Sequence, residues 1–259
     1  MKILTVVGAR PQFIKAATVS RILTNDKYNE ISEVVVHTGQ HYDHNMSQSF
    51  FTELNMTVPK YNLKVGSGTH GQQTGAIMCG LEGVIESECP DWILVYGDTN
   101  STVAAALVAA KKPCRLAHVE AGMRSYLRAH AEEVNRIVTD RLSDLLFCPT
   151  VSSKNNLIAE GLDNNAIITG DVMYDSFLYY GNAENYNSII QSYGLSTGNY
   201  LLVTIHRAEN VDDKERLNII LSALRSISRE IEIILPLHPR TRKMIEKFQF
   251  SLEGIRVVV

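Results

Sequence analysis

The chain has 259 residues, of which 45% are hydrophobic and 20% are charged, and its formal net charge is -3. These values are typical of a globular protein with one large domain or two smaller ones. Charges of both signs are interspersed, so we expect no basic face for nucleic acid or for a membrane of anionic lipid. No apolar run approaches the ~20 residues that cross a bilayer, and the apolar start is too short for a signal peptide.

The cysteines give no sign of a metal site or of a disulfide framework, because none of them stands in CxxC spacing. The four are Cys79, Cys89, Cys114 and Cys148. Their neighbours in the sequence are apolar or strand-like. We therefore expect free, buried thiols and a location in the reducing cytoplasm.

Short apolar runs alternate with segments of helical spacing along the first part of the chain. Strands are predicted at 3–7, 33–37, 92–96, 114–119, 145–148 and 166–169. Helices are predicted between them at 11–25, 45–54, 71–88, 101–111, 133–143 and 152–160. Repeated units of a strand and a helix predict a parallel sheet with right-handed crossovers, in the α/β class.

A second series follows a polar stretch at 181–199, in which a short helix is predicted at 188–193. Its strands are predicted at 200–205, 232–236 and 255–259, and its helices at 214–230 and 241–248. We place a domain boundary near 171–185, with domains at 1–175 and 176–259. The second series is half of a doubly wound sheet with an open edge, so we expect this domain to be partial and the protein to continue or a partner to complete it.

Two acidic residues stand where predicted strands end. Asp98 follows the strand at 92–96, and Glu120 follows the strand at 114–119. The carboxyl ends of parallel strands line the ligand crevice, so we expect both carboxylates to face one substrate and to serve acid/base chemistry. An alternative for Asp98 is that it caps the helix that begins near Ser101.

Other polar loops are predicted at the same edge of the sheet. Arg10 follows the first strand and precedes a helix N-terminus, where a phosphate can bind. The loop at 38–43 is dense in hydrogen-bonding groups, and charged residues crowd 124–136. Each has a plainer alternative, namely an exposed arginine, a solvated loop and, for Glu132, stabilisation of its charge by a helix dipole.

Two strands of the second series each end in a histidine and an arginine. His206 and Arg207 follow the first of these strands, and His238 and Arg240 follow the second. Such pairs at equivalent strand ends favour an anionic ligand held between the domains.

Taken in order, these loops resemble the non-hydrolysing UDP-N-acetylglucosamine 2-epimerase family, and the resemblance spans essentially the whole chain. Residues 68–72 and 95–102 are similar to the branch that acts on UDP-2,3-diacetamido-2,3-dideoxyglucuronic acid. The segments that carry the family resemblance are Gly8-Ala9-Arg10-Pro11, Thr38-Gly39-Gln40-His41, Gly97-Asp98-Thr99, His118-Val119-Glu120-Ala121-Gly122-Met123-Arg124, Glu132-Glu133-Val134-Asn135-Arg136, Gly170-Asp171-Val172-Met173, His206-Arg207-Ala208-Glu209-Asn210 and His238-Pro239-Arg240.

The resemblance implies a GT-B-like architecture, in which two Rossmann-like domains face each other across a cleft that holds a UDP-sugar. It also implies a homodimer that uses neither a metal nor a redox cofactor. The implied reaction inverts C2 of the sugar by eliminating UDP to a 2-acetamidoglucal and adding UDP back on the other face. The resemblance also implies a role in supplying precursors of bacterial surface polysaccharides, including lipopolysaccharide and capsule.

Residue by residue, the resemblance implies an acid/base set and a binding set. Asp98 is the first candidate for removing the C2 proton, and Glu120 is the second. Gln40 and His41 match a loop tied in some members to a second, regulatory UDP-sugar site. The acid/base set consists of Asp98, Glu120, Glu132 and His206, and the binding set consists of Arg10, Lys15, Gln40, His41, Arg136, His206, Arg207, His238 and Arg240.

The chain departs from the family pattern at two places. It reads His130-Ala131-Glu132-Glu133 where the family has Met-Pro-Glu-Glu, and loss of the proline relaxes the loop that carries Glu132. The family also has an Asp-Ser-Gly-Gly motif, which holds the diphosphate, beyond the point that corresponds to Val259. We therefore expect slow turnover by this chain alone. A hydrolysing epimerase and a catalytically inactive UDP-sugar-binding fragment stay open as alternatives.

Overall fold

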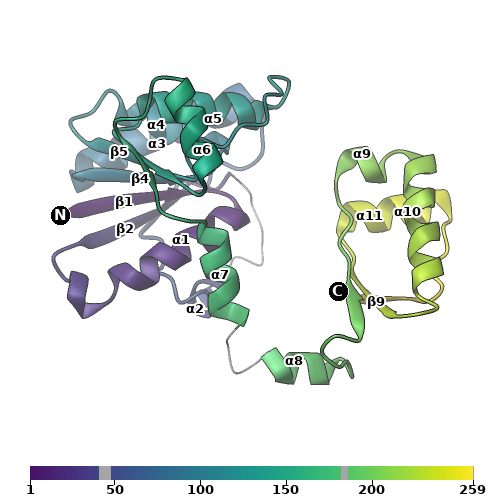
Figure 1. Cartoon of the computed structure of the whole chain (residues 1–259). Helices are drawn as coiled ribbons and strands as arrows, with labels where there is room; N and C mark the ends of the chain where they lie inside the picture. Colours follow the sequence, from purple (N-terminus) through teal and green to yellow (C-terminus); the bar gives the residue numbers. More distant parts are fainter. Residues whose placement is uncertain (41–47, 182–185, 259) are drawn as a thin grey trace. The chain divides into compact units, whose positions relative to one another are not determined.

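The computed structural model describes residues 1–40, 48–181 and 186–258 (Figure 1). The chain divides into two compact units, Met1–Tyr180 and Gly181–Val259. Each unit has its own parallel sheet and its own apolar core. Within the described residues, none of the helices is both long and apolar enough to cross a membrane.

The first unit is built on a seven-stranded sheet in the order β3-β2-β1-β4-β5-β6-β7, and all the pairings are parallel. The order reverses direction between β1 and β4, and a ligand crevice forms outside the carboxyl ends of the strands at such a point. The strands are β1 (Lys2–Val7), β2 (Ser32–His37), β3 (Tyr61–Asn62), β4 (Trp92–Tyr96), β5 (Arg115–Val119), β6 (Leu145–Cys148) and β7 (Ala166–Ile168).

Helices cover both faces of this sheet, with α3, α4 and α5 over one face and α1, α2 and α7 over the other (Figure 1). Leu4 and Val6 of β1 pack with α3 and α4, whereas Val7 packs with Phe13 of α1. Strands buried on both faces read as continuous apolar runs, as observed here. The helices are α1 (Arg10–Leu23), the 3₁₀ helix η1 (Asp26–Tyr28), α2 (Gln48–Glu53), α3 (His70–Glu88), α4 (Asn100–Ala109), α5 (Ala131–Leu142), α6 (Val151–Ala159) and α7 (Val172–Gly181).

The second unit has a three-stranded parallel sheet in the order β10-β9-β8. Its core includes Leu217 and Leu221 of α10 and Ile233 of β9, each fully buried. The elements are α8 (Tyr186–Ser192), β8 (Tyr200–Leu202), α9 (Ala208–Val211), α10 (Lys214–Ile227), β9 (Glu232–Pro236), α11 (Pro239–Phe248) and β10 (Ile255–Val258).

The predicted elements are found with small shifts, and the predictions were wrong at a few places. Strand β8 ends at Leu202 rather than at residue 205, so His206 lies in an irregular segment. Helix α7 was missed, because the domain boundary predicted near 171–185 covers the segment that forms it. The short elements η1, β3 and α9 were also missed. Residues 45–47 of the predicted helix 45–54 lie outside the described residues.

The four cysteines are free, as expected, but burial was predicted wrongly for two of them. Cys148 is buried, whereas Cys79 and Cys89 are exposed. Cys79 lies between the buried Ile77 and Leu81 in sequence, on the side of α3 that faces solvent. Cys89 follows the last residue of the same helix and has left-handed backbone geometry, with a φ of 45°.

The carboxylate of Glu88 joins the end of α3 to the sheet. It accepts hydrogen bonds from Lys60 Nζ and from Tyr61 Oη, each at 2.6 Å, and from Lys2 Nζ at 3.2 Å. The hydrogen bonds from Lys60, Tyr61 and Lys2 lower the pKa of Glu88 to about 2, against the opposing effect of burial. Edge strand β3 is only two residues long, so this contact helps to hold it.

We predict that Glu88→Gln lowers the melting temperature by a few degrees at pH 7. A carboxylate whose folded pKa is depressed contributes stability above its unfolded pKa of about 4.3, and this contribution is lost as the pH falls through the folded pKa. The difference between variant and wild type should therefore shrink between pH 4 and pH 2. Glu86→Gln is the control, because Glu86 is exposed and pairs with Lys112 alone among the contacts found for its carboxylate in the described structure. A larger effect in the control would contradict the prediction.

Candidate functional site

Asp98 follows β4 at the carboxyl edge of the first sheet. Its carboxylate, 28% exposed, forms an ion pair with Arg136 of α5. Its main-chain carbonyl accepts a hydrogen bond from Asn135 Nδ2 at 2.8 Å. The residue that caps α4 is Thr99, whose side chain accepts from the Thr102 amide. The capping alternative for Asp98 is therefore wrong, and its carboxylate is turned toward α5 instead.

Glu120 follows β5, and its carboxylate forms an ion pair with Lys15 of α1, each side chain being 17% exposed. Its φ is 71°, a left-handed conformation that costs a residue with a side chain roughly 1–2 kcal/mol. Gly97 makes room for this carboxylate, since a Cβ added there would lie 3.2 Å from Glu120 Oε2. The carboxylate of Glu120 therefore lies against the residue that precedes Asp98.

In the loop that carries Arg10, two main-chain amides already donate hydrogen bonds to a side chain of α1. The amides of Gly8 and Ala9 donate to Gln12 Oε1 at 2.9 and 3.0 Å, and Gln12 Nε2 donates to the Tyr96 carbonyl at 2.8 Å. A phosphate at this loop would therefore meet the exposed Arg10 rather than the Gly8 and Ala9 amides. Gln12 was not singled out from the sequence, where it reads as an ordinary helix residue.

Gln40 is buried and its side-chain oxygen accepts from the amide of Ser101 at 2.9 Å and from Ser101 Oγ at 2.6 Å. The side chain of Gln40 thus connects the loop after β2 to the start of α4. Gln40 also lines a cavity of about 370 Å³, together with Asp98, Asn100, Glu132 and Asn135. His41 lies outside the described residues.

The segment 124–136 contains two adjacent acids in different surroundings. Glu132 is exposed in the first turn of α5 and lines the cavity beside Asp98. Glu133 is buried and accepts from the amides of Ser125 and Tyr126 at 2.9 and 3.0 Å. Burial raises the pKa of Glu133, but the hydrogen bonds from Ser125 and Tyr126 and the charge of Arg136 lower it overall.

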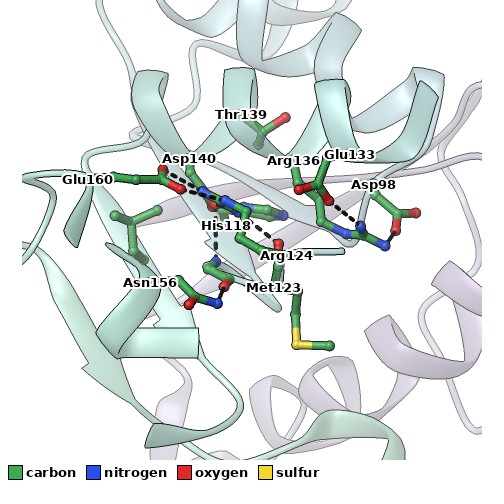
Figure 2. A network of polar contacts seen from close by, with 12 residues as sticks. Asp98, His118, Met123, Arg124, Glu133, Arg136, Thr139, Asp140, Asn156 and Glu160 are labelled. Carbon is green, nitrogen blue, oxygen red and sulfur yellow. Dashed lines mark hydrogen bonds and ion pairs between the residues drawn. The ribbon is translucent and has the colours of Figure 1, made fainter. Parts of the chain in front are cut away.

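Behind these loops, a buried polar network links β5, α5 and α6 (Figure 2). His118 Nδ1 lies 2.7 Å from Asp140 Oδ1, and Arg124 Nη1 lies 2.7 Å from Asp140 Oδ2. Arg124 also binds Glu160 through Nε at 2.7 Å and Nη2 at 2.8 Å. Burial raises the pKa of Asp140, but its contacts with His118 and Arg124 lower it overall, so it is a carboxylate.

The positive charge of Arg124, the cation of this network, is also stabilised by its neighbours. Burial lowers the pKa of Arg124, but Glu160 and Asp140 together raise it above its ordinary value. Arg124 was predicted to belong to the crowded loop near the substrate, yet its side chain is 1% exposed and points into this network. His118 and Asp140 were not predicted from the sequence to belong to the site. The available indication was that His118 stands two positions before Glu120, at the end of the same strand.

In the second unit, the four predicted binding residues lie after β8 and β9. The rings of His206 and His238 are 5.8 Å apart, and the amide of Arg240 donates to His238 Nδ1 at 3.2 Å. Arg240 forms a two-point ion pair with Asp212, at 3.0 and 2.5 Å. Arg207 lies 3.7 Å from Glu209. The strands of this unit thus bring the two histidines together.

A larger cavity, of about 990 Å³, lies at the opposite edge of the first sheet. It is lined by Met1, Trp92 and Arg115, which stand where β1, β4 and β5 begin. The strand starts carry neither of the acids at positions 98 and 120. The volume of a cavity therefore does not identify the functional site. The candidate site is the carboxyl edge of the sheet, where Asp98 and Glu120 lie.

The model of the family described as UDP-N-acetylglucosamine 2-epimerase matches residues 23–259. A Pseudomonas aeruginosa protein named UDP-2,3-diacetamido-2,3-dideoxy-D-glucuronate 2-epimerase is 49% identical over 258 residues, which are 98% of this chain and 71% of the relative. A Methanococcus maripaludis protein named UDP-N-acetylglucosamine 2-epimerase homolog is 48% identical over 96% of this chain and 69% of its own length.

Solved structures agree. The chain matches the Methanocaldococcus jannaschii UDP-GlcNAc 2-epimerase in complex with UDP-GlcNAc and UDP, with a TM-score of 0.84 and 41% identity, over 100% of this chain and 73% of the other. It matches the Neisseria meningitidis enzyme bound to UDP-GlcNAc with a TM-score of 0.86 and 32% identity, over 100% and 72%. The predicted α/β, GT-B-like class is thereby confirmed. The chain belongs to the UDP-N-acetylglucosamine 2-epimerase family.

Proposed function

We propose that the protein is a non-hydrolysing UDP-N-acetylglucosamine 2-epimerase that inverts C2 of a UDP-2-acetamido sugar. The observation that carries this proposal is the pair of carboxylates at the ends of β4 and β5. The two strands are paired in parallel, with Tyr96 opposite Val119, so Asp98 and Glu120 emerge from neighbouring turns. Each carboxylate is partly buried and forms an ion pair with a cationic side chain, Arg136 for Asp98 and Lys15 for Glu120.

In the proposed reaction, a carboxylate removes the C2 proton, and the C–H electron pair forms the double bond between C1 and C2. The bond from C1 to the UDP oxygen breaks, and UDP leaves with that electron pair. Addition of UDP back to C1, with proton delivery to the other face of C2, completes the inversion. We assign the first proton transfer to Asp98 and the second acid/base role to Glu120, with Glu132 and His206 completing the set.

The ion pairs of the first unit support these roles in two ways. Arg136 and Lys15 keep the neighbouring carboxylates oriented, and their positive charge favours a dianionic diphosphate near the edge of the sheet. We propose that Arg10, Lys15, Gln40, His41 and Arg136 contact the UDP-sugar from this unit.

From the second unit, we propose that His206, Arg207, His238 and Arg240 bind the diphosphate. Exposed ion pairs such as Arg240 with Asp212 are weak, so an incoming diphosphate can displace the carboxylate at little cost. Domains at 1–175 and 176–259, a homodimer, a cytoplasmic location and a role in bacterial surface polysaccharide synthesis complete the proposal. The name of the Pseudomonas aeruginosa relative makes the 2,3-diacetamido uronate a second substrate to test.

The direct test follows the C2 proton by NMR in D2O, with UDP-GlcNAc and with the 2,3-diacetamido uronate analogue. We expect deuterium at C2 in a manno-configured UDP-sugar. Asp98→Asn should reduce this exchange by about 100-fold or more, because it removes the base and leaves the side-chain shape. UDP affinity, measured by calorimetry, should stay near normal. Asp163→Asn, on an exposed loop, is the control. Retained exchange in Asp98→Asn would remove Asp98 from the mechanism, and free sugar with UDP would indicate the hydrolysing reaction.

We also predict that His206→Ala weakens both UDP binding and turnover, each by about 10-fold or more, because a charge-assisted contact to the diphosphate is lost. Lys243→Ala, which removes an exposed charge from α11 of the same unit, should change neither quantity. Calorimetric titration with UDP and initial rates of C2 exchange measure the two effects. An unchanged UDP affinity in His206→Ala would show that His206 does not contact the diphosphate.

A further inference from the structure

The buried pair of His118 and Asp140 is attached to the main chain of both carboxylate-bearing turns. His118 Nε2 lies 2.7 Å from the Gly97 carbonyl, which can only accept, so Nε2 donates. Asp140 Oδ2 accepts from the Gly122 amide at 3.1 Å. Gly97 directly precedes Asp98, and Gly122 follows Glu120 by two positions. The pair therefore bridges the two turns.

Both members of the pair are fully buried, with side chains 0% exposed. Burying charged or polar groups is costly, and an apolar pair of similar volume often stabilises a core as well or better. The role of this pair is therefore best inferred from the groups to which it is hydrogen-bonded. Among the described residues, the hydrogen-bond partners of this pair apart from Arg124 are main-chain groups of the two turns.

The turns need such a support, because their backbone conformations are unusual. Gly97 has a φ of 65°, Glu120 of 71° and Gly122 of 77°. A left-handed residue with a side chain persists only where its surroundings over-determine it. The ladder of β4 and β5 ends at Tyr96 and Val119, so regular pairing alone does not define the geometry beyond it.

We propose that His118, oriented by Asp140, is a positioning residue that fixes the Gly97–Asp98 turn relative to the turn that carries Glu120. The catalytic consequence rests on the proposed function, in which both carboxylates act on one sugar carbon. A displacement of about 1 Å at such a site can cost on the order of 100-fold in rate. His118 itself touches no substrate, because its ring is enclosed in the core.

Two substitutions of His118 separate its two hydrogen bonds. The amide nitrogen of glutamine can reach the place of Nε2, so His118→Gln can keep the bond to the Gly97 carbonyl. The amide nitrogen of asparagine reaches only the place of Nδ1, so His118→Asn keeps the contact with Asp140 and releases Gly97. Both variants remove the imidazole, and a role limited to core packing would affect them alike.

The first readout is amide hydrogen exchange in the unliganded chain, followed by NMR or by mass spectrometry of peptides that cover 97–100 and 120–124. We expect at least 10-fold faster exchange of the Gly97 amide in His118→Asn and near-normal exchange in His118→Gln. The wild-type amide of Gly97 donates to the Val119 carbonyl at 3.0 Å, so it reports the contact between the turns. Equal loss of protection in both variants, or in neither, would overturn the proposal.

The second readout is the rate of C2 proton exchange with UDP-GlcNAc. We expect kcat to fall about 10- to 100-fold in His118→Asn with little change in KM, and to fall much less in His118→Gln. Leu81→Ala, a core substitution in α3, lowers stability without touching the turns, so its folded fraction should keep the wild-type kcat. A kcat loss in His118→Asn no larger than in Leu81→Ala would overturn the proposal.

The two readouts distinguish failure of this proposal from failure of the proposed function. If the wild-type chain does not exchange the C2 proton of either UDP-sugar, the epimerase proposal fails. Amide exchange at Gly97 still decides whether His118 positions the turn, because it needs no ligand and no turnover.

Discussion

The parallel pairing of β4 with β5 is the contact on which the candidate site depends. Its register places Tyr96 opposite Val119, so both strands end at the same level of the sheet. Gly97 and Glu120 then meet, because Gly97 has no side chain to occupy the space of the Glu120 carboxylate. A shift of one residue in this register would separate Gly97 from Glu120 and the space that Gly97 leaves for the carboxylate. The register therefore places the turns that carry the two acids side by side.

Charge in the first unit is arranged in two layers. At the edge of the sheet, the carboxylates at 98 and 120 pair with Arg136 and Lys15 and keep partial exposure. Behind them, the buried network of His118, Asp140 and Arg124 is closed to solvent and bonds to main-chain groups. Solvent reaches the outer layer, whereas the inner layer is rigid because its groups have no water to replace a lost contact.

Several expectations from the sequence needed the structure to correct or refine them. The alternative that Asp98 caps a helix is wrong, because Thr99 takes that role and its hydroxyl reaches the Thr102 amide. The alternative of a solvated loop at 38–43 is wrong for Gln40, which is buried against Ser101. The glycine loop at the start of α1 looked open to a phosphate, yet Gln12 occupies two of its amides. In each case a short polar side chain had several partners within reach, and only packing decided among them.

The sequence by itself determined the α/β class, the strands β4, β6 and β9 to the residue, and the acids at the strand ends. These follow from local rules, since apolar runs, period and turn residues act over a few positions. Only the tertiary structure decided the order of the strands, the missed helix α7 and the partners of each charge. The strand order and the contact between His118 and Asp140 both depend on residues that are distant in the sequence. The energies of such contacts depend on burial, which cannot be read from a local sequence pattern.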